Sequence, residues 1–133
     1  MSHERLSQFA YHSTLADGQS ASCVGTIIKV ARAFNALHGI TGVLLFDGER
    51  FCQYVEGAPS TLDALVQRIR TDLRHNQFTP LLHGPLAGGR RYPQWSMAYS
   101  DASQDALIDL MIDGAPQDAL VLLKEREWML DIG

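Results

Sequence analysis

The sequence predicts an α/β domain in which helices pack on one face of a sheet. Three observations carry this prediction: short segments that alternate apolar and polar residues, two longer segments with apolar residues at helical spacing, and glycine-containing turns between them. A chain of 133 residues is long enough for one domain with its own core. Because 46% of the residues are hydrophobic and 20% are charged, an ordinary globular protein is expected.

The first half of the chain alternates strand and helix patterns. A strand is expected over Leu6–Ser13 and a helix over Ala21–His38. Ile40–Phe46 is apolar almost throughout, which is typical of a buried central strand. Asp47-Gly48 predicts a tight hairpin turn, so the next strand, Arg50–Glu56, is expected to pair antiparallel with the one before it.

The second half adds a helix, two strands and two further helices. Ser60-x-x-Asp63 resembles a capping box and predicts a helix that runs to about Asp72. A fourth strand is expected over Phe78–Leu86, at the edge of the sheet because Pro80 has no N–H to donate. Three more elements follow: a strand over Trp95–Ser100 and helices near Gln104–Ile112 and Gln117–Met129.

The order β-α-β-β-α-β, followed by a fifth strand and helices, is the ferredoxin-like pattern. Its right-handed crossovers leave both helices on one face of the sheet, and we expect the first and third strands side by side and parallel. We divide the chain into a domain over 1–100 and a helical extension over 101–133, which is expected to cover the other face of the sheet or to bind a partner. The apolar residues of this extension are Leu120, Val121, Leu122, Leu123, Trp128, Met129 and Leu130.

Composition and spacing exclude several classes of function. A net charge of −4 argues against nucleic acid as a partner, because phosphate binding needs a basic face. The chain shows no apolar signal core and no apolar run near the ~18 residues of a membrane span, so we predict a cytoplasmic protein that does not enter a membrane. The histidines lack metal-ligand spacing, and serine, histidine and aspartate occur without a nucleophile elbow. We therefore predict no metal site and no enzymatic activity.

Three hydrogen-bonding side chains are expected under the two helices. Alternation places Tyr11 on the same strand face as Phe9, and Gln53 on the same face as Phe51. Asn35 continues the apolar stripe of the first helix. An unpaired buried amide costs about 1–3 kcal/mol, so these groups need partners. Either they satisfy one another, or they bind a polar, planar ligand between the helices.

Five sequence blocks occur in order between residues 6 and 100. They are Phe9-Ala-Tyr11-His-Ser, Asn35-Ala-Leu-His-Gly-Ile-Thr-Gly, Phe51-Cys-Gln53-Tyr-Val-Glu-Gly57, Asp72-Leu-Arg74-His75 and Arg90-Arg-Tyr-Pro-Gln-Trp95-Ser-Met97. Together they resemble the successive blocks of BLUF domains, which sense blue light with a flavin. The Gly-Ile-Thr-Gly and Gln-x-x-Glu-Gly blocks make the resemblance specific.

The resemblance implies a noncovalent FAD whose isoalloxazine ring lies between the two helices. It assigns Tyr11 as the donor of an electron and then a proton, Gln53 as the bridge from Tyr11 to the flavin, and Asn35 as a partner of the pyrimidine edge. Aliphatic side chains are expected on either side of the ring, and polar ones at its edge and along the ribityl and phosphate tail. These are Ile27 and Ile69 for the ring faces, and Arg68, Asp72, Arg74 and His75 for the edge and tail.

The resemblance also implies how the signal leaves the domain. Trp95 and Met97 match a pair near the glutamine to which signal output is assigned. The expected function is a blue-light photoreceptor that signals to another protein or subunit, with assembly into a homo-oligomer expected.

Two departures from the family pattern keep alternatives open. Phe34 replaces a second asparagine and Ala31 replaces a serine, so hydrogen bonds to a flavin are lost. One alternative is therefore a BLUF-like regulatory binding module with weak or lost flavin binding. Another is a small ferredoxin-like enzyme of the acylphosphatase kind, although its glycine- and arginine-containing phosphate loop is absent.

Overall fold

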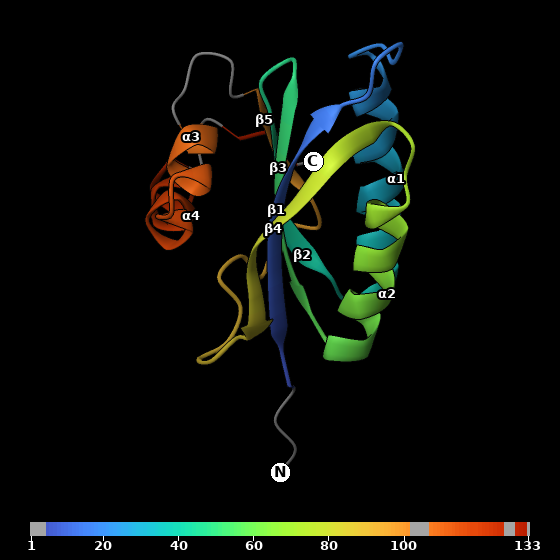
Figure 1. Cartoon of the computed structure of the whole chain (residues 1–133). Helices are drawn as coiled ribbons and strands as arrows, with labels where there is room; N and C mark the ends of the chain where they lie inside the picture. The colour runs from blue at the N-terminus through green and yellow to red at the C-terminus, as the bar shows by residue number, and fades with distance from the viewer. Residues whose placement is uncertain (1–4, 102–106, 127–129, 133) are drawn as a thin grey trace.

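The computed structural model describes residues 5–101, 107–126 and 130–132 of the chain. A central sheet has α1 and α2 on one side and α3 and α4 on the other (Figure 1). The elements are β1 (Ser7–Leu15), α1 (Cys23–His38), β2 (Thr41–Phe46), β3 (Arg50–Gly57), α2 (Pro59–Arg70), β4 (His75–Pro85), β5 (Ala98–Asp101), α3 (Leu107–Ile112) and α4 (Pro116–Glu125). This order confirms the predicted ferredoxin-like fold class with an added strand and C-terminal helices. Of the predicted helical residues, 104–106 and 127–129 lie outside the described part.

The five strands lie in the order β4-β1-β3-β2-β5. β1 pairs antiparallel with both β3 and β4, and only the β2–β5 pair is parallel. The predicted parallel pairing of the first and third strands is therefore wrong. A β-α-β crossover makes β2 parallel to β1, and the β2–β3 hairpin then reverses the chain, so β3 must run against β1. The edge position predicted for the strand with Pro80 is confirmed.

Two predicted turn signals have different outcomes. The hairpin between β2 and β3 is confirmed: Asp47 and Arg50 close it with a backbone hydrogen bond, and Gly48 has a φ of 98°. The capping box at the start of the second helix is wrong. α2 begins at Pro59, after Ala58, and no side chain caps its first turn. Proline at the first helical position fits because its fixed φ suits the helix and that N–H would be unpaired anyway.

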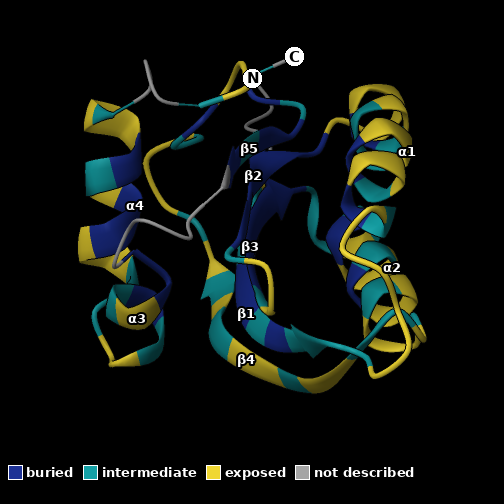
Figure 2. Ribbon diagram, turned by 90° about the horizontal axis from the view of Figure 1, so that it is seen from above, coloured by how far each residue is buried: buried dark blue, intermediate teal, exposed yellow. Residues whose placement is uncertain are grey.

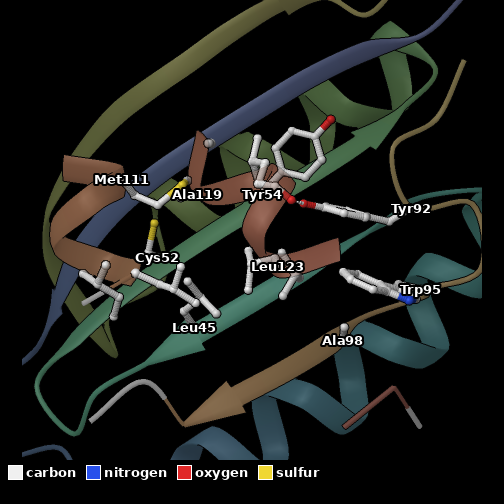
Figure 3. Packing of buried hydrophobic residues seen from close by; sticks show 14 residues of the cluster. Leu45, Cys52, Tyr54, Tyr92, Trp95, Ala98, Met111, Ala119 and Leu123 are labelled. Atoms are coloured by element: carbon white, nitrogen blue, oxygen red, sulfur yellow. Dashed lines mark hydrogen bonds between the residues drawn. The ribbon is translucent and has the colours of Figure 1, made fainter. Parts of the chain in front are cut away.

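The central strands of the sheet are buried on both faces and are the darkest part of the molecule in Figure 2, whereas the edge strand β4 contains no buried residue. Alternation along β1 and β3 sends Phe9 and Val55 to the layer under α1 and α2, and Ala10 and Tyr54 to the layer under α3 and α4. The second layer is a dense apolar cluster in which α3 and α4 pack on the sheet (Figure 3). Within the described residues, no helix has the length and apolar character needed to cross a membrane.

Candidate functional site

A cavity of about 150 Å³ lies between α1, α2 and the sheet. Both apolar and polar side chains line this cavity, so it can accept a ligand that has both kinds of surface. The structure brings together at this cavity every residue that the sequence assigned to flavin contact. They are Tyr11, Ile27, Asn35, Gln53, Arg68, Ile69, Asp72, Arg74 and His75.

Tyr11 and Gln53 form the inner wall of the cavity. They are directly opposite each other on β1 and β3, and both are buried. The Tyr11 hydroxyl donates to Gln53 Oε1 at 2.6 Å. Gln53 Nε2 in turn lies 3.8 Å from Met97 Sδ, a weak acceptor. Because the amide nitrogen carries two hydrogens and the sulfur takes one, Gln53 keeps a donor for a ligand.

The Tyr11 phenol is held in its protonated form. Burial raises the pKa of Tyr11 far above its usual value, and the nearby Cys52 and Asp72 side chains raise it further. The hydroxyl is therefore a hydrogen-bond donor to Gln53 over the whole physiological pH range.

Asn35 has one amide end satisfied and the other unsatisfied. Its Nδ2 donates to the Ser96 main-chain oxygen at 2.7 Å. Its Oδ1 is buried and has no hydrogen-bond partner among the described residues. An acceptor left in this state costs about 1–3 kcal/mol. A ligand N–H that reached this oxygen would remove that cost. The interpretation of Asn35 as a residue satisfied by the protein therefore holds for its nitrogen, and the ligand interpretation stays a prediction for its oxygen.

The polar residues at the end of α2 are largely paired with protein groups. His75 Nε2 donates to the Ile69 main-chain oxygen at 2.5 Å, and Nδ1 lies 2.7 Å from Ser13 Oγ. His75 therefore offers its ring surface to the cavity while both nitrogens are used. Arg74 Nε donates to Asp72 Oδ1 at 3.0 Å and its terminal nitrogen to Oδ2 at 2.5 Å, and these hydrogen bonds hold the pKa of the Asp72 carboxyl below its usual value.

Each of the two helices contributes an aliphatic side chain to the lining of the cavity. Ile27 belongs to α1 and Ile69 to α2, and both side chains are half-buried. Nearer the opening, the guanidinium of Arg68 lies 4.5 Å from the centre of the Phe34 ring, a cation–π contact that joins the two helices. A lining of this kind suits a ligand that is mostly apolar and has a polar edge.

The two residues assigned to signal output lie in different layers. Met97 is fully buried beside Gln53, in the cluster under α1 and α2. Trp95 is fully buried in the opposite cluster, where its ring stacks on Tyr92 at 4.2 Å (Figure 3). The expected placement of Trp95 near the glutamine is therefore wrong. The two residues are two positions apart but precede β5 in an irregular segment, so strand alternation does not place them on one face.

Sequence reasoning missed the contacts that hold this segment in place. Ser96 accepts the Asn35 hydrogen bond, and Arg32 Nε donates to the Met97 main-chain oxygen at 3.0 Å. Both acceptors are main-chain carbonyls more than sixty residues from their donors. No sequence pattern marks such an acceptor, since every residue carries the same group.

A family model for sensors of blue light using FAD matches residues 6–98, a segment that contains the whole cavity wall. The chain belongs to the BLUF family. BLUF proteins with solved structures share its fold. The dark-state structure of the BLUF protein BlrB superimposes with a TM-score of 0.74 at 30% identity, covering 92% of this chain and 94% of that one.

Two curated BLUF relatives are much longer proteins. The chain is 34% identical over 85 residues to the photoactivated adenylate cyclase subunit alpha of Euglena gracilis, covering 64% of this chain and 8% of that protein. It is 28% identical over 96 residues to the blue light- and temperature-regulated antirepressor BluF of Escherichia coli strain K12, covering 72% of this chain and 24% of that protein. The chain thus spans less than a tenth of the cyclase subunit and about a quarter of the antirepressor.

Proposed function

We propose that this protein is a blue-light photoreceptor that binds FAD noncovalently between α1 and α2 and signals to a partner protein. The observation that carries the proposal is the 2.6 Å hydrogen bond from Tyr11 to Gln53 at the wall of a cavity that is also lined by Asn35, whose buried Oδ1 has no hydrogen-bond partner among the described residues. We propose that the domain acts as a sensor and not as an enzyme, with any catalytic or regulatory output located in the partner.

The residues at the cavity fit a flavin. Ile27 and Ile69 provide two apolar walls for a planar ring, and the Asn35 oxygen needs an N–H of the kind that the pyrimidine edge of a flavin carries. The remaining N–H of Gln53 is available to a ring nitrogen or carbonyl. Arg68 places positive charge on the cavity wall, which suits the phosphates of the tail, whereas the charge of Arg74 is balanced by Asp72. FAD is favoured over FMN by the family description, although one relative, BlrP1 of Klebsiella pneumoniae, has been solved with FMN.

When bound, the flavin supplies the absorption of blue light and an acceptor for one electron. Tyr11 is an oxidisable side chain in the inner wall, and its hydroxyl proton points at Gln53 Oε1. Gln53 both accepts and donates through one amide, so rotation or tautomerisation of that amide exchanges its two ends at nearly constant volume. The exchange changes which amide atom of Gln53, the oxygen or the nitrogen, lies against Met97 and against the ligand. Such a local change in hydrogen bonding can shift the balance between two conformations of the protein.

A second candidate function is a BLUF-like regulatory module that binds flavin weakly. Ala31 and Phe34 line the cavity with apolar groups at positions where the family pattern has hydrogen-bonding side chains. Arg68 is also engaged with the Phe34 ring, so less of its charge is free for the cofactor. A purified protein that is colourless and does not take up added FAD favours this second function.

Tyr11→Phe and Gln53→Leu test the proposed switch. Each variant keeps the shape of the cavity, so each is expected to bind FAD but to lose the reversible red shift that blue light induces in the flavin band. Tyr54→Phe is a matched control because Tyr54 is an equally buried tyrosine on the opposite face of the sheet. It should retain the shift. Normal photocycling of either the Tyr11 or the Gln53 variant contradicts the proposed roles.

A further inference from the structure

Two side chains of α1 hold the main chain on both sides of Met97. Asn35 Nδ2 donates to the Ser96 oxygen at 2.7 Å, and Arg32 Nε donates to the Met97 oxygen at 3.0 Å. Residues three apart on a helix lie on the same face, so the two donors act side by side. The peptide groups before and after Met97 are therefore fixed by the same helix that supplies Asn35 and Ile27 to the cavity.

The segment held in this way contacts the proposed switch directly. Met97 is fully buried and its sulfur lies 3.8 Å from Gln53 Nε2. If the Gln53 amide exchanges its ends, the sulfur then faces an oxygen in place of an N–H. The thioether sulfur carries no hydrogen and can only accept weakly, so this contact changes from attractive to repulsive and Met97 must shift.

Arg32 also holds the C-terminal end of the described chain. Its second nitrogen donates to the Asp131 main-chain oxygen at 2.8 Å and lies 3.2 Å from Asp131 Oδ1. Asp131 in turn exchanges two main-chain hydrogen bonds with Tyr99 in β5, at 2.8 and 2.9 Å. The planar guanidinium has donors in fixed directions and can serve both acceptors at once. One side chain thus joins α1, the segment before β5 and the residues that follow α4.

We propose that Arg32 is a positioning residue that couples the Gln53–Met97 contact to the main chain at Asp131. The inference rests on the proposed photoreceptor function. A shift of Met97 moves the carbonyl that Arg32 holds, and the rigid fork must then give up or re-aim its hydrogen bond to Asp131. The coupling runs through the main-chain acceptors, because the Asp131 carboxylate is 66% exposed and an exposed ion pair contributes little. Arg32 is not one of the described residues that line the cavity.

The test uses the full chain loaded with FAD and follows the return of the red-shifted flavin band in the dark. The hydrogen bonds of Arg32 belong to the dark arrangement, so their loss should slow recovery in Arg32→Ala by about twofold to tenfold, as expected for part of one charge-assisted hydrogen bond. Arg32→Lys should behave in the same way, since a single ammonium does not reproduce the fork. The affinity for FAD and the size of the red shift should match the wild-type values.

Two matched variants and a second readout make the outcome decisive. Lys29→Ala removes an exposed cation one turn earlier on α1. Asp131→Asn removes the ion pair with Arg32 but keeps the main-chain acceptor. Both variants should recover at the wild-type rate. Light should increase amide hydrogen exchange at Tyr99 and Asp131 in the wild type but not in Arg32→Ala. If Arg32→Ala shows the red shift, recovers at the wild-type rate and shows the wild-type light-induced increase in amide hydrogen exchange, the proposed role of Arg32 is wrong. This outcome leaves the photoreceptor proposal intact. Absence of the red shift in the wild type overturns the photoreceptor proposal together with this inference.

Discussion

The two ends of the Asn35 amide differ in their hydrogen bonding. The nitrogen donates to the Ser96 carbonyl, and the oxygen has no hydrogen-bond partner among the described residues. Tyr11 and Gln53 are divided in the same way, because their mutual hydrogen bond leaves one Gln53 N–H for the cavity. At the scale of single residues, some polar atoms at the cavity therefore have protein partners, and others have none among the described residues.

Replacement of Asn35 by alanine should affect both ligand binding and stability. The loss of one or two ligand hydrogen bonds, about 1–3 kcal/mol, should weaken FAD binding roughly tenfold to a hundredfold. The loss of the bond to Ser96 should also lower the stability of the apoprotein by about 1 kcal/mol. Titration with FAD and thermal melting of the apoprotein measure the two effects. Asn76→Ala, an exposed position on β4, serves as the control. Unchanged FAD affinity with a large drop in apoprotein stability would show that Asn35 is a core residue only.

Strand and helix periodicity was sufficient to predict that Tyr11, Gln53 and Asn35 meet. Each of them lies on the same face of its strand or helix as apolar residues of the core, and in the folded chain these faces line the same cavity. The pairing of His75 with Ser13 and Ile69 could not be predicted, because it depends on how β4 approaches β1 after the turn. Nor could the placement of Trp95, which follows from an irregular segment without a repeat.

At the scale of elements, β2 and β3 approach each other unusually closely at one position. A Cβ on Gly42 would lie 2.0 Å from the Tyr54 main-chain oxygen, a distance that real carbon atoms do not reach. The Gly42 N–H also donates to the Trp95 main-chain oxygen at 2.8 Å, which ties the segment before β5 to β2. The absence of a side chain at residue 42 is therefore a requirement of the sheet that carries Gln53.

Gly42→Ala should destabilise the protein severely, because the clash is with main chain that cannot turn away. We expect a loss of about 3 kcal/mol or more, as for other forced overpacking in a core. Urea unfolding of the apoprotein measures it. Gly25→Ala is the matched control: residue 25 is exposed on α1 and its Cβ meets no atom within 4 Å, so this change should stabilise the protein by about 0.5–1 kcal/mol. Equal stabilities of the two variants would contradict the close approach.

At the scale of the whole molecule, one sheet separates two cores. The layer under α1 and α2 contains the cavity, and the layer under α3 and α4 is closely packed around Tyr54, Tyr92 and Trp95. The division of the chain into 1–100 and 101–133 stays a prediction, as do the cytoplasmic location and the homo-oligomer. β5 contributes to both layers, because Ala98 is buried in the cluster with α3 and α4 and Tyr99 packs against the other cluster.

The ionisation of three of the four tyrosines reports on how well both layers exclude solvent. Burial raises the pKa of Tyr11, Tyr54 and Tyr92 well above the usual value of about 10. The folded state therefore keeps protons that the unfolded state releases above pH 10. Their contribution to stability is complete below pH 10 and falls as the pH rises beyond it, by about 1.4 kcal/mol per pH unit for each tyrosine.

The expected result is that these tyrosines ionise only when the apoprotein unfolds. Absorbance at 295 nm and far-ultraviolet circular dichroism should therefore change together in an alkaline titration. Ionisation of the three tyrosines near pH 10 with the circular dichroism unchanged would show that the two cores are open to solvent.

The absorption spectrum of the purified protein before and after blue light tests the central claim most directly. A photoreceptor built on Tyr11, Gln53 and Asn35 should contain one FAD per chain. Its flavin band should shift slightly to the red on illumination, without bleaching, and return in the dark, because the hydrogen bonds around the ring change while its redox state is restored. A colourless protein that cannot be reconstituted with FAD, or a bound flavin whose band does not shift, would contradict the account.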